Sequence, residues 1–254
     1  MSRNERWEVG ERPFLEVRVP VGTIEIYAVE AGVVELLVDA TDADEFEIFK
    51  TGDRISVRHP SRWRMRGRSS RLVAHVPVGT DVEINSTSGE VRLVGRLGVV
   101  RVHTASGDVE VNDAARIEVT TASGQFTCGE ISGDANISSV SGDCTLRVVG
   151  GRLDATLTSG DLRVDDCNGD VTVGSTSGDV RVGRCCGSEI AVRSISGDLR
   201  IGLPSGIRVE AEISTLSGRA TLPEAAPKSE TGERRPVRLN LRTVSGDIRV
   251  ERTS

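Results

Sequence analysis

The chain has 254 residues, a formal net charge of −6 at pH 7 and only 3% aromatic residues. The length suits one large β-domain or two ordinary ones. The scarcity of aromatic side chains excludes a core built on them, and the negative charge argues against a surface devoted to nucleic acid. The apolar residues are mostly Val, Ile, Leu and Ala, and the chain contains 28 glycines. This composition is typical of strands and tight turns rather than helices.

Residues 1–11 are polar and charged, and we expect them to form an N-terminal tail. They contain no apolar core of signal-peptide length, and no window of the chain is apolar enough to predict a transmembrane helix. The five cysteines have no zinc-like spacing, in agreement with a reducing compartment. These features predict a cytoplasmic protein and give no support to surface exposure.

Residues 12–80 contain runs typical of strands, such as FLEVRV and VVELLVDA, without a fixed spacing. We expect irregular N-terminal β-coils or a cap here. The open end of a repeat stack exposes strand edges, and these edges need covering.

Residues 58–71 are rich in arginine and contain no acidic residue. The candidate site residues in this segment are Arg58, Arg62, Trp63, Arg64, Arg66, Arg68 and Arg71. Such a segment can bind an anionic partner, whether lipid headgroups, nucleic acid or an acidic protein face. The alternative is an exposed loop between two strands whose charges are solvated.

Residues 81–222 repeat the phrase Ser-Gly-Asp or a close variant. In one repeat Val171 and Val173 precede the turn and Val180 and Val182 follow it, and the other repeats have apolar residues or cysteine at these positions. This alternation places the side chains on one face of a strand, so each repeat has two short strands. The first seven glycines, 17 to 19 residues apart, are Gly89, Gly107, Gly124, Gly142, Gly160, Gly178 and Gly197.

The regular period of about 18 residues predicts an all-β fold, a parallel β-solenoid with two short strands per coil. Successive coils stack about 4.8 Å apart, and the inward side chains fill a narrow core. Right-handed crossovers dominate parallel sheets, so we expect a right-handed coil.

The Ser-Gly-Asp phrase is interpreted as the corner that every coil needs. Glycine supplies a turn with positive φ, and the Ser and Asp side chains hydrogen-bond neighbouring backbone groups. Repeated aspartates at solenoid corners can instead bind calcium. Here a single glycine precedes the aspartate and an arginine stands beside it, which favours the structural role.

Two further columns are predicted from the same alignment. Cys167 and Cys185 fall one coil apart in one column, a spacing that permits a disulfide, although a reduced pair filling a corner fits the expected compartment better. Hydroxyl residues close to the corners are expected to form an outward column: Thr104, Thr121, Ser139, Ser175, Ser194, Thr215 and Thr243.

The C-terminal part contains one interruption of the repeat. Residues 223–236 form a polar, proline-bearing segment that predicts a loop. Residues 237–254 restore the pattern with VRLNLRTVSGDIRV. We expect them to form the final coil and the C-terminal end of the chain.

Residues 12–250 resemble a bacterial family of β-strand-repeat domains known as "putative adhesins", a family of unknown function. The resemblance lies in the serial SGDVxV phrases and in VPVGTIEI (residues 19–26) and VPVGTDVEI (residues 76–84). It implies a right-handed β-helix-like domain and no catalytic residues.

The leading functional hypothesis is a non-enzymatic scaffold or binding module, whose partner is a protein or an envelope polymer. The histidines His59, His75 and His103 are scattered, and no motif of a nucleophile, metal or phosphate site occurs. We therefore expect no catalytic residue, cofactor or metal. Homo-oligomers through the solenoid ends are a further expectation, and nucleic acid is not expected as a partner.

Two alternatives remain open. One is a membrane-surface or envelope-stress accessory protein that binds anionic partners through residues 58–71. The other, less favoured, is a carbohydrate-active β-helix enzyme. Such enzymes need paired carboxylates, typically with aromatic platforms, and aromatic residues are nearly absent from the coils.

Overall fold

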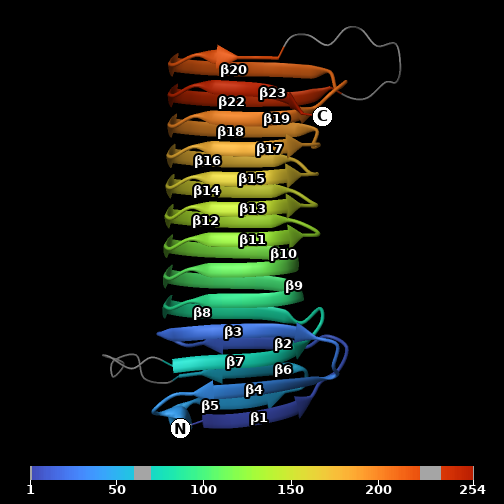
Figure 1. The fold of residues 1–254 in the computed structure, drawn as a ribbon, viewed down its shortest axis with the longest axis vertical. Coiled ribbons are helices and arrows are strands. Elements are labelled where there is room, and N and C mark those ends of the chain that lie inside the picture. Colours follow the sequence, from blue (N-terminus) through green and yellow to red (C-terminus); the bar gives the residue numbers. More distant parts are fainter. Residues whose placement is uncertain (1, 60–69, 224–235, 254) are drawn as a thin grey trace. The chain divides into compact units, whose positions relative to one another are not determined.

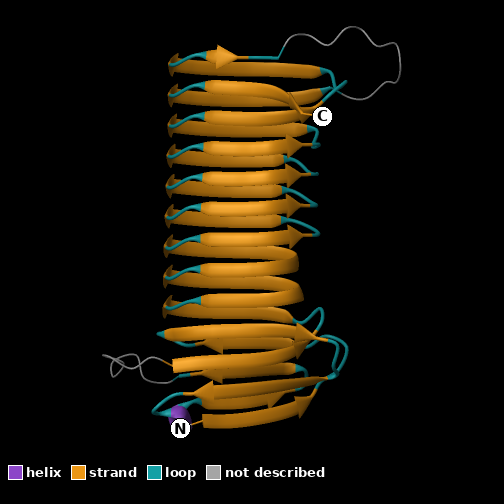
Figure 2. Cartoon of the chain, in the orientation of Figure 1, coloured by secondary structure: helices purple, strands orange, loops and turns teal. Residues whose placement is uncertain are grey.

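The computed structural model describes residues 2–59, 70–223 and 236–253. The chain divides into two compact units, residues 1–129 and residues 130–254. Each unit consists almost entirely of strands (Figure 2), and the one helix in the described ranges is the single-turn η1 (Ala43–Glu45).

The first unit holds two runs of hydrogen-bonded strands. One run is β1-β4-β7-β3-β9 and the other is β5-β6-β2-β8-β9, and β10 continues both. The strands are β1 (Ser2–Glu8), β2 (Phe14–Arg18), β3 (Gly22–Val29), β4 (Val33–Asp39), β5 (Glu47–Thr51), β6 (Arg54–Arg58), β7 (Ser70–Pro77), β8 (Asp81–Ser88), β9 (Val91–Ser106), β10 (Val109–Ser123) and, across the unit boundary, β11 (Phe126–Ile131).

The second unit stacks two parallel ladders, β12-β14-β16-β18-β22-β20 and β13-β15-β17-β19-β23-β21. The strands are β12 (Ala135–Ser141), β13 (Cys144–Val149), β14 (Leu153–Ser159), β15 (Leu162–Cys167), β16 (Val171–Ser177), β17 (Val180–Cys185), β18 (Glu189–Ser196), β19 (Leu199–Pro204), β20 (Val209–Ser217), β21 (Ala220–Thr221), β22 (Val237–Ser245) and β23 (Ile248–Thr253).

The predicted fold class is confirmed: the protein is all-β, with parallel solenoid coils. In the repeat used above, Val171 lies opposite Ile190 of the next coil, and Val180 lies opposite Leu199. These side chains are at most 1% exposed, so the alternating apolar positions do fill the core. The right-handed sense of the coil stays a prediction.

The corner aspartates connect each coil to the next. Asp143 Oδ1 accepts the backbone N–H of Asp161 at 2.9 Å, and Asp161 Oδ1 accepts that of Asp179 at 2.8 Å. The glycine between Ser177 and Asp179 has φ 121°, a conformation that other residues rarely adopt. The recurrence of Ser-Gly-Asp is therefore explained by coil-to-coil hydrogen bonding.

The hydroxyl column points inward, and the outward prediction is wrong. Thr121 is 3% exposed and its Oγ1 donates to the Ser123 carbonyl at 3.0 Å; Thr243 is 5% exposed and bonds the Ser245 carbonyl in the same way. Alternate residues of a strand point to the same face, and each of these residues stands two positions after an inward apolar residue. Cys167 and Cys185 do lie opposite each other, as buried free thiols.

Residues 2–8, expected within a polar tail, instead form β1, which pairs antiparallel with β4. Their side chains alternate between exposed and half-buried, with Trp7 among the half-buried ones. A polar sequence can form a strand at the edge of a sheet because one neighbour suffices there, and its charges discourage further pairing.

The last coil of the sequence is not the last coil of the stack. β22 pairs with β18 on one side and with β20 on the other, and β23 likewise lies between β19 and β21 (Figure 1). Residues 237–254 do form the coil that ends the chain, but the coil of β20 and β21, which comes earlier in the sequence, occupies the end of the stack.

Two features explain this insertion. The inner coil contributes Leu239, Leu241, Ile248 and Val250, each at most 2% exposed, and large apolar side chains gain most where a coil has two neighbours. At the corners, Asp198 accepts the N–H of Asp247, and Asp247 accepts the N–H of Arg219. The outermost coil carries Arg219 in place of aspartate, and no coil follows it in the described part of the second unit.

Cysteine crosslinking tests the insertion. Ala191 lies opposite Asn240, and Asn240 lies opposite Glu212. In a Cys186→Ser background, Ala191→Cys with Asn240→Cys is expected to form a disulfide on oxidation, because neighbouring strands are about 4.8 Å apart. The control, Ala191→Cys with Glu212→Cys, spans about twice that distance and should stay reduced. Peptide masses after non-reducing digestion give the readout; a crosslink in the control alone would mean that the coils stack in sequence order.

Candidate functional site

A buried carboxylate gathers three arginines on the outer face of β2 and β6. The two strands are parallel, with Glu16 opposite Ser56 and Arg18 opposite Arg58. Glu16 is fully buried, although its side chain points away from the apolar core, because the arginines cover it. We call Arg18, Arg54 and Arg58 around Glu16 the arginine cluster.

The contacts around Glu16 are short. Arg18 Nε lies 2.6 Å from Oε1 and Arg58 Nη2 lies 3.1 Å from the same oxygen. Arg54 Nη2 and Ser56 Oγ each lie 2.8 Å from Oε2. Both carboxylate oxygens are thus bound by charged donors, which make the strong class of protein hydrogen bonds.

The arginine cluster controls the ionisation of Glu16. Burial by itself raises the pKa of this carboxyl group. Hydrogen bonds from Arg54 and Ser56, together with the charges of Arg18 and Arg58, outweigh burial and lower the pKa from 4.5 to about 2. Glu16 is therefore a carboxylate at any physiological pH.

The arginines keep much of their surface in solvent. Their side chains are 49%, 48% and 39% exposed for Arg18, Arg54 and Arg58. Three positive charges meet one negative charge, so the four side chains carry a net +2. Acidic neighbours are present, since Glu47 lies opposite Arg58 on β5 and Glu83 lies opposite Glu16 on β8.

Two aromatic rings flank the guanidinium groups. Arg54 lies over the ring of Phe14 at 4.2 Å, and Arg58 lies over the ring of Phe49 at 5.4 Å. These are cation–π distances. Phe49 is 44% exposed, so an apolar side chain is presented to solvent beside the positive charge.

The structure separates the two ends of the predicted arginine-rich segment. Arg58 belongs to the arginine cluster, whereas Arg71 lies on β7 and binds Glu25 at 2.9 Å. The predicted residues Arg62, Trp63, Arg64, Arg66 and Arg68 lie outside the described residues. Sequence reasoning missed Glu16, Arg18 and Arg54, because only the pairing of β2 with β6 brings them together.

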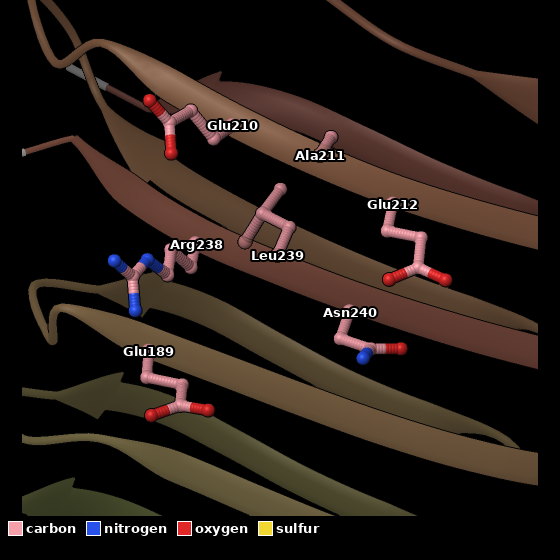
Figure 3. Close-up of a pocket in the computed structure, with 7 residues that line it drawn as sticks. All are labelled: Glu189, Glu210, Ala211, Glu212, Arg238, Leu239 and Asn240. Carbon is pink, nitrogen blue, oxygen red and sulfur yellow. The ribbon is translucent and has the colours of Figure 1, made fainter.

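A shallow hollow of about 480 Å³ lies on the outer face of the second unit (Figure 3). It is lined by β18, β22 and β20, where Arg238 lies opposite Glu189 on one side and Glu210 on the other. Alternating acidic and basic side chains partly balance its charge. The lining residues are Glu189, Glu210, Ala211, Glu212, Arg238, Leu239 and Asn240, and none of them is a serine, cysteine or histidine that could act as a nucleophile.

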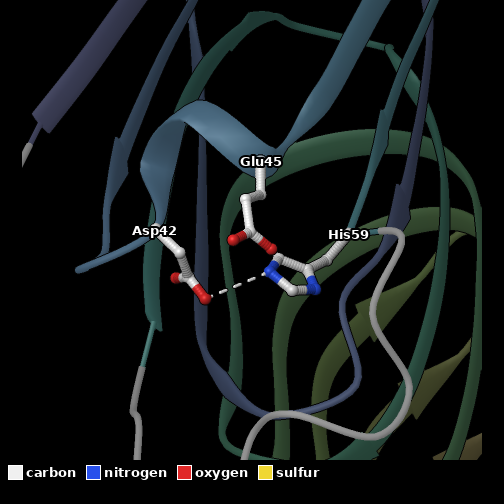
Figure 4. A group of neighbouring side chains, drawn as sticks. All are labelled: Asp42, Glu45 and His59. Atoms are coloured by element: carbon white, nitrogen blue, oxygen red, sulfur yellow. Dashed lines mark ion pairs between the residues drawn. The ribbon is translucent and has the colours of Figure 1, made fainter.

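One group in the described residues has ligand atoms spaced as a metal would need: Asp42, Glu45 and His59, within 4.8 Å of one another (Figure 4). An imidazole with two carboxylates is a donor set that zinc accepts with one position open. The His59 side chain is fully buried, its Nε2 lies 3.4 Å from Asp42 Oδ2, and its ring packs edge-on against Phe46 at 4.8 Å. The contacts with Asp42 and Phe46 account for this position without a metal.

No helix in the described ranges is long and apolar enough to cross a membrane. The sequence family that matches the chain is Toastrack DUF4097, over residues 15–251. No curated protein matches the chain.

Solved structures with similar chains include several from bacteria. One, described as a "putative adhesin" from Bacteroides fragilis, shares 12% identity over 100% of this chain and 97% of its own, with a TM-score of 0.47. A second "putative adhesin", from Parabacteroides distasonis, shares 12% identity over 100% of this chain and 97% of its own, with a TM-score of 0.45. A "putative lipid binding protein" from Parabacteroides distasonis shares 11% identity over 100% of this chain and 97% of its own, with a TM-score of 0.44.

Proposed function

Because the chain belongs to the Toastrack DUF4097 family, we propose that it is a non-enzymatic binding scaffold whose stacked coils hold outward side chains in fixed positions for a partner. The recurring corners support this proposal, since coil-to-coil hydrogen bonds account for them without a reaction. Repeat proteins of this kind offer extended rigid faces to other molecules.

The arginine cluster supports a more specific role, in which the scaffold binds an anionic surface. The observation that carries it is the convergence of three half-exposed arginines on one fully buried carboxylate. Glu16 uses some of their donors and holds the guanidinium groups in place, so little conformational entropy remains to be lost on binding. The outer N–H groups are left for phosphate or carboxylate oxygens, which guanidinium groups bind well.

An anionic membrane surface fits the cluster better than nucleic acid does. The exposed ring of Phe49 stands beside Arg58, and the chain continues into a segment with Trp63 among arginines. Aromatic and cationic side chains together are typical of membrane interfaces.

Vesicle flotation tests the membrane role. The protein is expected to float at low salt with vesicles of equal parts phosphatidylglycerol and phosphatidylcholine, and not with phosphatidylcholine alone. The double variant Arg18→Gln, Arg58→Gln keeps Arg54 and Ser56 on Glu16. Since each arginine near an anionic leaflet contributes about 1 kcal/mol, it should bind roughly thirtyfold more weakly.

The matched control is Arg163→Gln with Arg181→Gln, which removes the same charge from β15 and β17. It should bind as the unchanged protein does. Equal weakening of both variants would mean that net charge alone matters. Competition by duplex DNA at equal phosphate concentration, or no flotation at low salt, would likewise contradict the membrane role.

A further inference from the structure

The outermost coil of the second unit has a free edge. β20 pairs with β22 on one side, and within residues 130–223 and 236–253 no strand pairs with its other side. Its inward residues are correspondingly uncovered: Ala211 and Ala220 are exposed, Leu222 is 52% exposed and Ile213 is half-buried. The equivalent inward residues of the coil beneath it are at most 2% exposed.

The unpaired backbone groups of β20 can be identified. The N–H of Val237 donates to the carbonyl of Arg208 at 2.9 Å, so Arg208 directs its backbone groups toward β22. Successive residues of a strand direct theirs to opposite sides. Ala211, Ile213 and Thr215 therefore present their N–H and C=O groups at the free edge.

The free edge has only part of the usual protection against pairing. Natural edges carry Pro, Lys or other charged side chains, a bulge or an inward charge. Residues 209–217 (VEAEISTLS) contain no Pro or Lys and no inward charge, and their only charged side chains are the outward Glu210 and Glu212. The sequence of residues 224–235, EAAPKSETGERR, is poorly suited to cap this edge. It contains no Val, Ile, Leu or aromatic residue that could continue the apolar columns.

We propose that a second copy of this chain covers the free edge, so that two chains pair end to end through β20 and β21 about a two-fold axis. A two-fold axis across the strands places β20 antiparallel to its partner copy, with inward side chains again facing inward. Each copy then uses the same surface, as in most homodimers.

The charges on β20 limit the register of this pairing. An axis at Glu212 would place that carboxylate opposite its own copy, and an axis at Ala211 would place Glu210 opposite Glu212. Like charges directly opposite one another destabilise a sheet. An axis at Ile213 places Glu210 opposite Leu216 and Glu212 opposite Ser214, and it lets the residues whose backbone groups face the edge bond one another directly.

Sedimentation equilibrium of three single variants tests the dimer. Ala211→Pro removes an N–H that points to the free edge and is not used within one chain, so it should raise the dimer dissociation constant at least about thirtyfold through two lost hydrogen bonds. Ile213→Lys places an inward charge at the edge and should have at least that effect. Ala211→Val keeps the N–H and should remain dimeric.

Thermal melts monitored by circular dichroism accompany the measurement, and Ala211→Pro should melt as Ala211→Val does at concentrations where both are monomeric. A wild-type protein that stays monomeric up to millimolar concentration overturns the proposal. Proline and lysine variants that dimerise as tightly as the wild type overturn it too.

Discussion

Replacing Gly178 with alanine is expected to destabilise the second unit by about 3–5 kcal/mol. The φ of Gly178 is 121°, and a Cβ at this residue would stand 2.2 Å from the carbonyl oxygen of Gly160 in the preceding coil. That oxygen belongs to a backbone held by its own ladder, so it cannot move aside as a flexible side chain could. A strained backbone costs about 1–3 kcal/mol, and overpacking a fixed site costs about as much again.

The matched control is Gly174→Ala in the strand of the same coil. A Cβ at Gly174 would meet no heavy atom within 4 Å, so this change should be neutral or should stabilise by about 0.4–1 kcal/mol through the unfolded chain. Urea unfolding followed by circular dichroism gives the comparison. Equal midpoints for the two variants would show that the corner tolerates a side chain and that the stacked glycines are not required.

Replacing Glu16 with glutamine is the second change with a large expected effect, a loss of about 3–5 kcal/mol of stability. The substitution leaves Arg18, Arg54 and Arg58 close together without their counter-charge, and breaking a buried charge network from one side costs this much. The control is Glu25→Gln on β3, whose carboxylate binds the largely exposed Arg71. An ion pair of that kind contributes about 1 kcal/mol or less.

The effect of Glu16 on stability should depend on pH. The pKa of this group is about 2 in the folded protein against an ordinary 4.5, so the unfolded state binds the proton first as the pH falls. The stabilisation is fully present above pH 4.5 and is lost as the pH falls toward 2. It amounts to about 3 kcal/mol. Urea midpoints across this window should fall more steeply for the wild type than for Glu16→Gln; parallel curves would contradict the role of Glu16.

The candidate site could be predicted only in part. Arg58 stands in a run of arginines that any reading of composition singles out, whereas Glu16 and Arg54 are 38 residues apart in a region without a fixed repeat. Their contact depends on the parallel pairing of β2 with β6. No periodicity marks that register, so the sequence indicated positive charge near residue 58 and missed the carboxylate that organises it.

The sequence contains one indication of the order in which the C-terminal coils stack. Each corner aspartate bonds the backbone of the following coil, so the outermost coil has no need of one, and Arg219 stands where the other corners of the second unit carry aspartate. Chain order is the default order of stacking in a repeat protein, and it would put residues 237–254 last in the stack.

The sequence by itself determined the all-β class, the two strands of each coil, their inward columns and their corners. All of these follow from the local alternation of apolar residues and from a repeat of about 18 residues. Both patterns recur within each coil and do not depend on which coil lies next to it. Tertiary structure alone decided which segments become neighbours when the repeat is absent or interrupted: the strand formed by residues 2–8, the arginine cluster and the inserted coil. Pairing between distant strands depends on which strand edge is unpaired and on which apolar surface gains more free energy when it is buried. Neither is defined until the rest of the chain has folded.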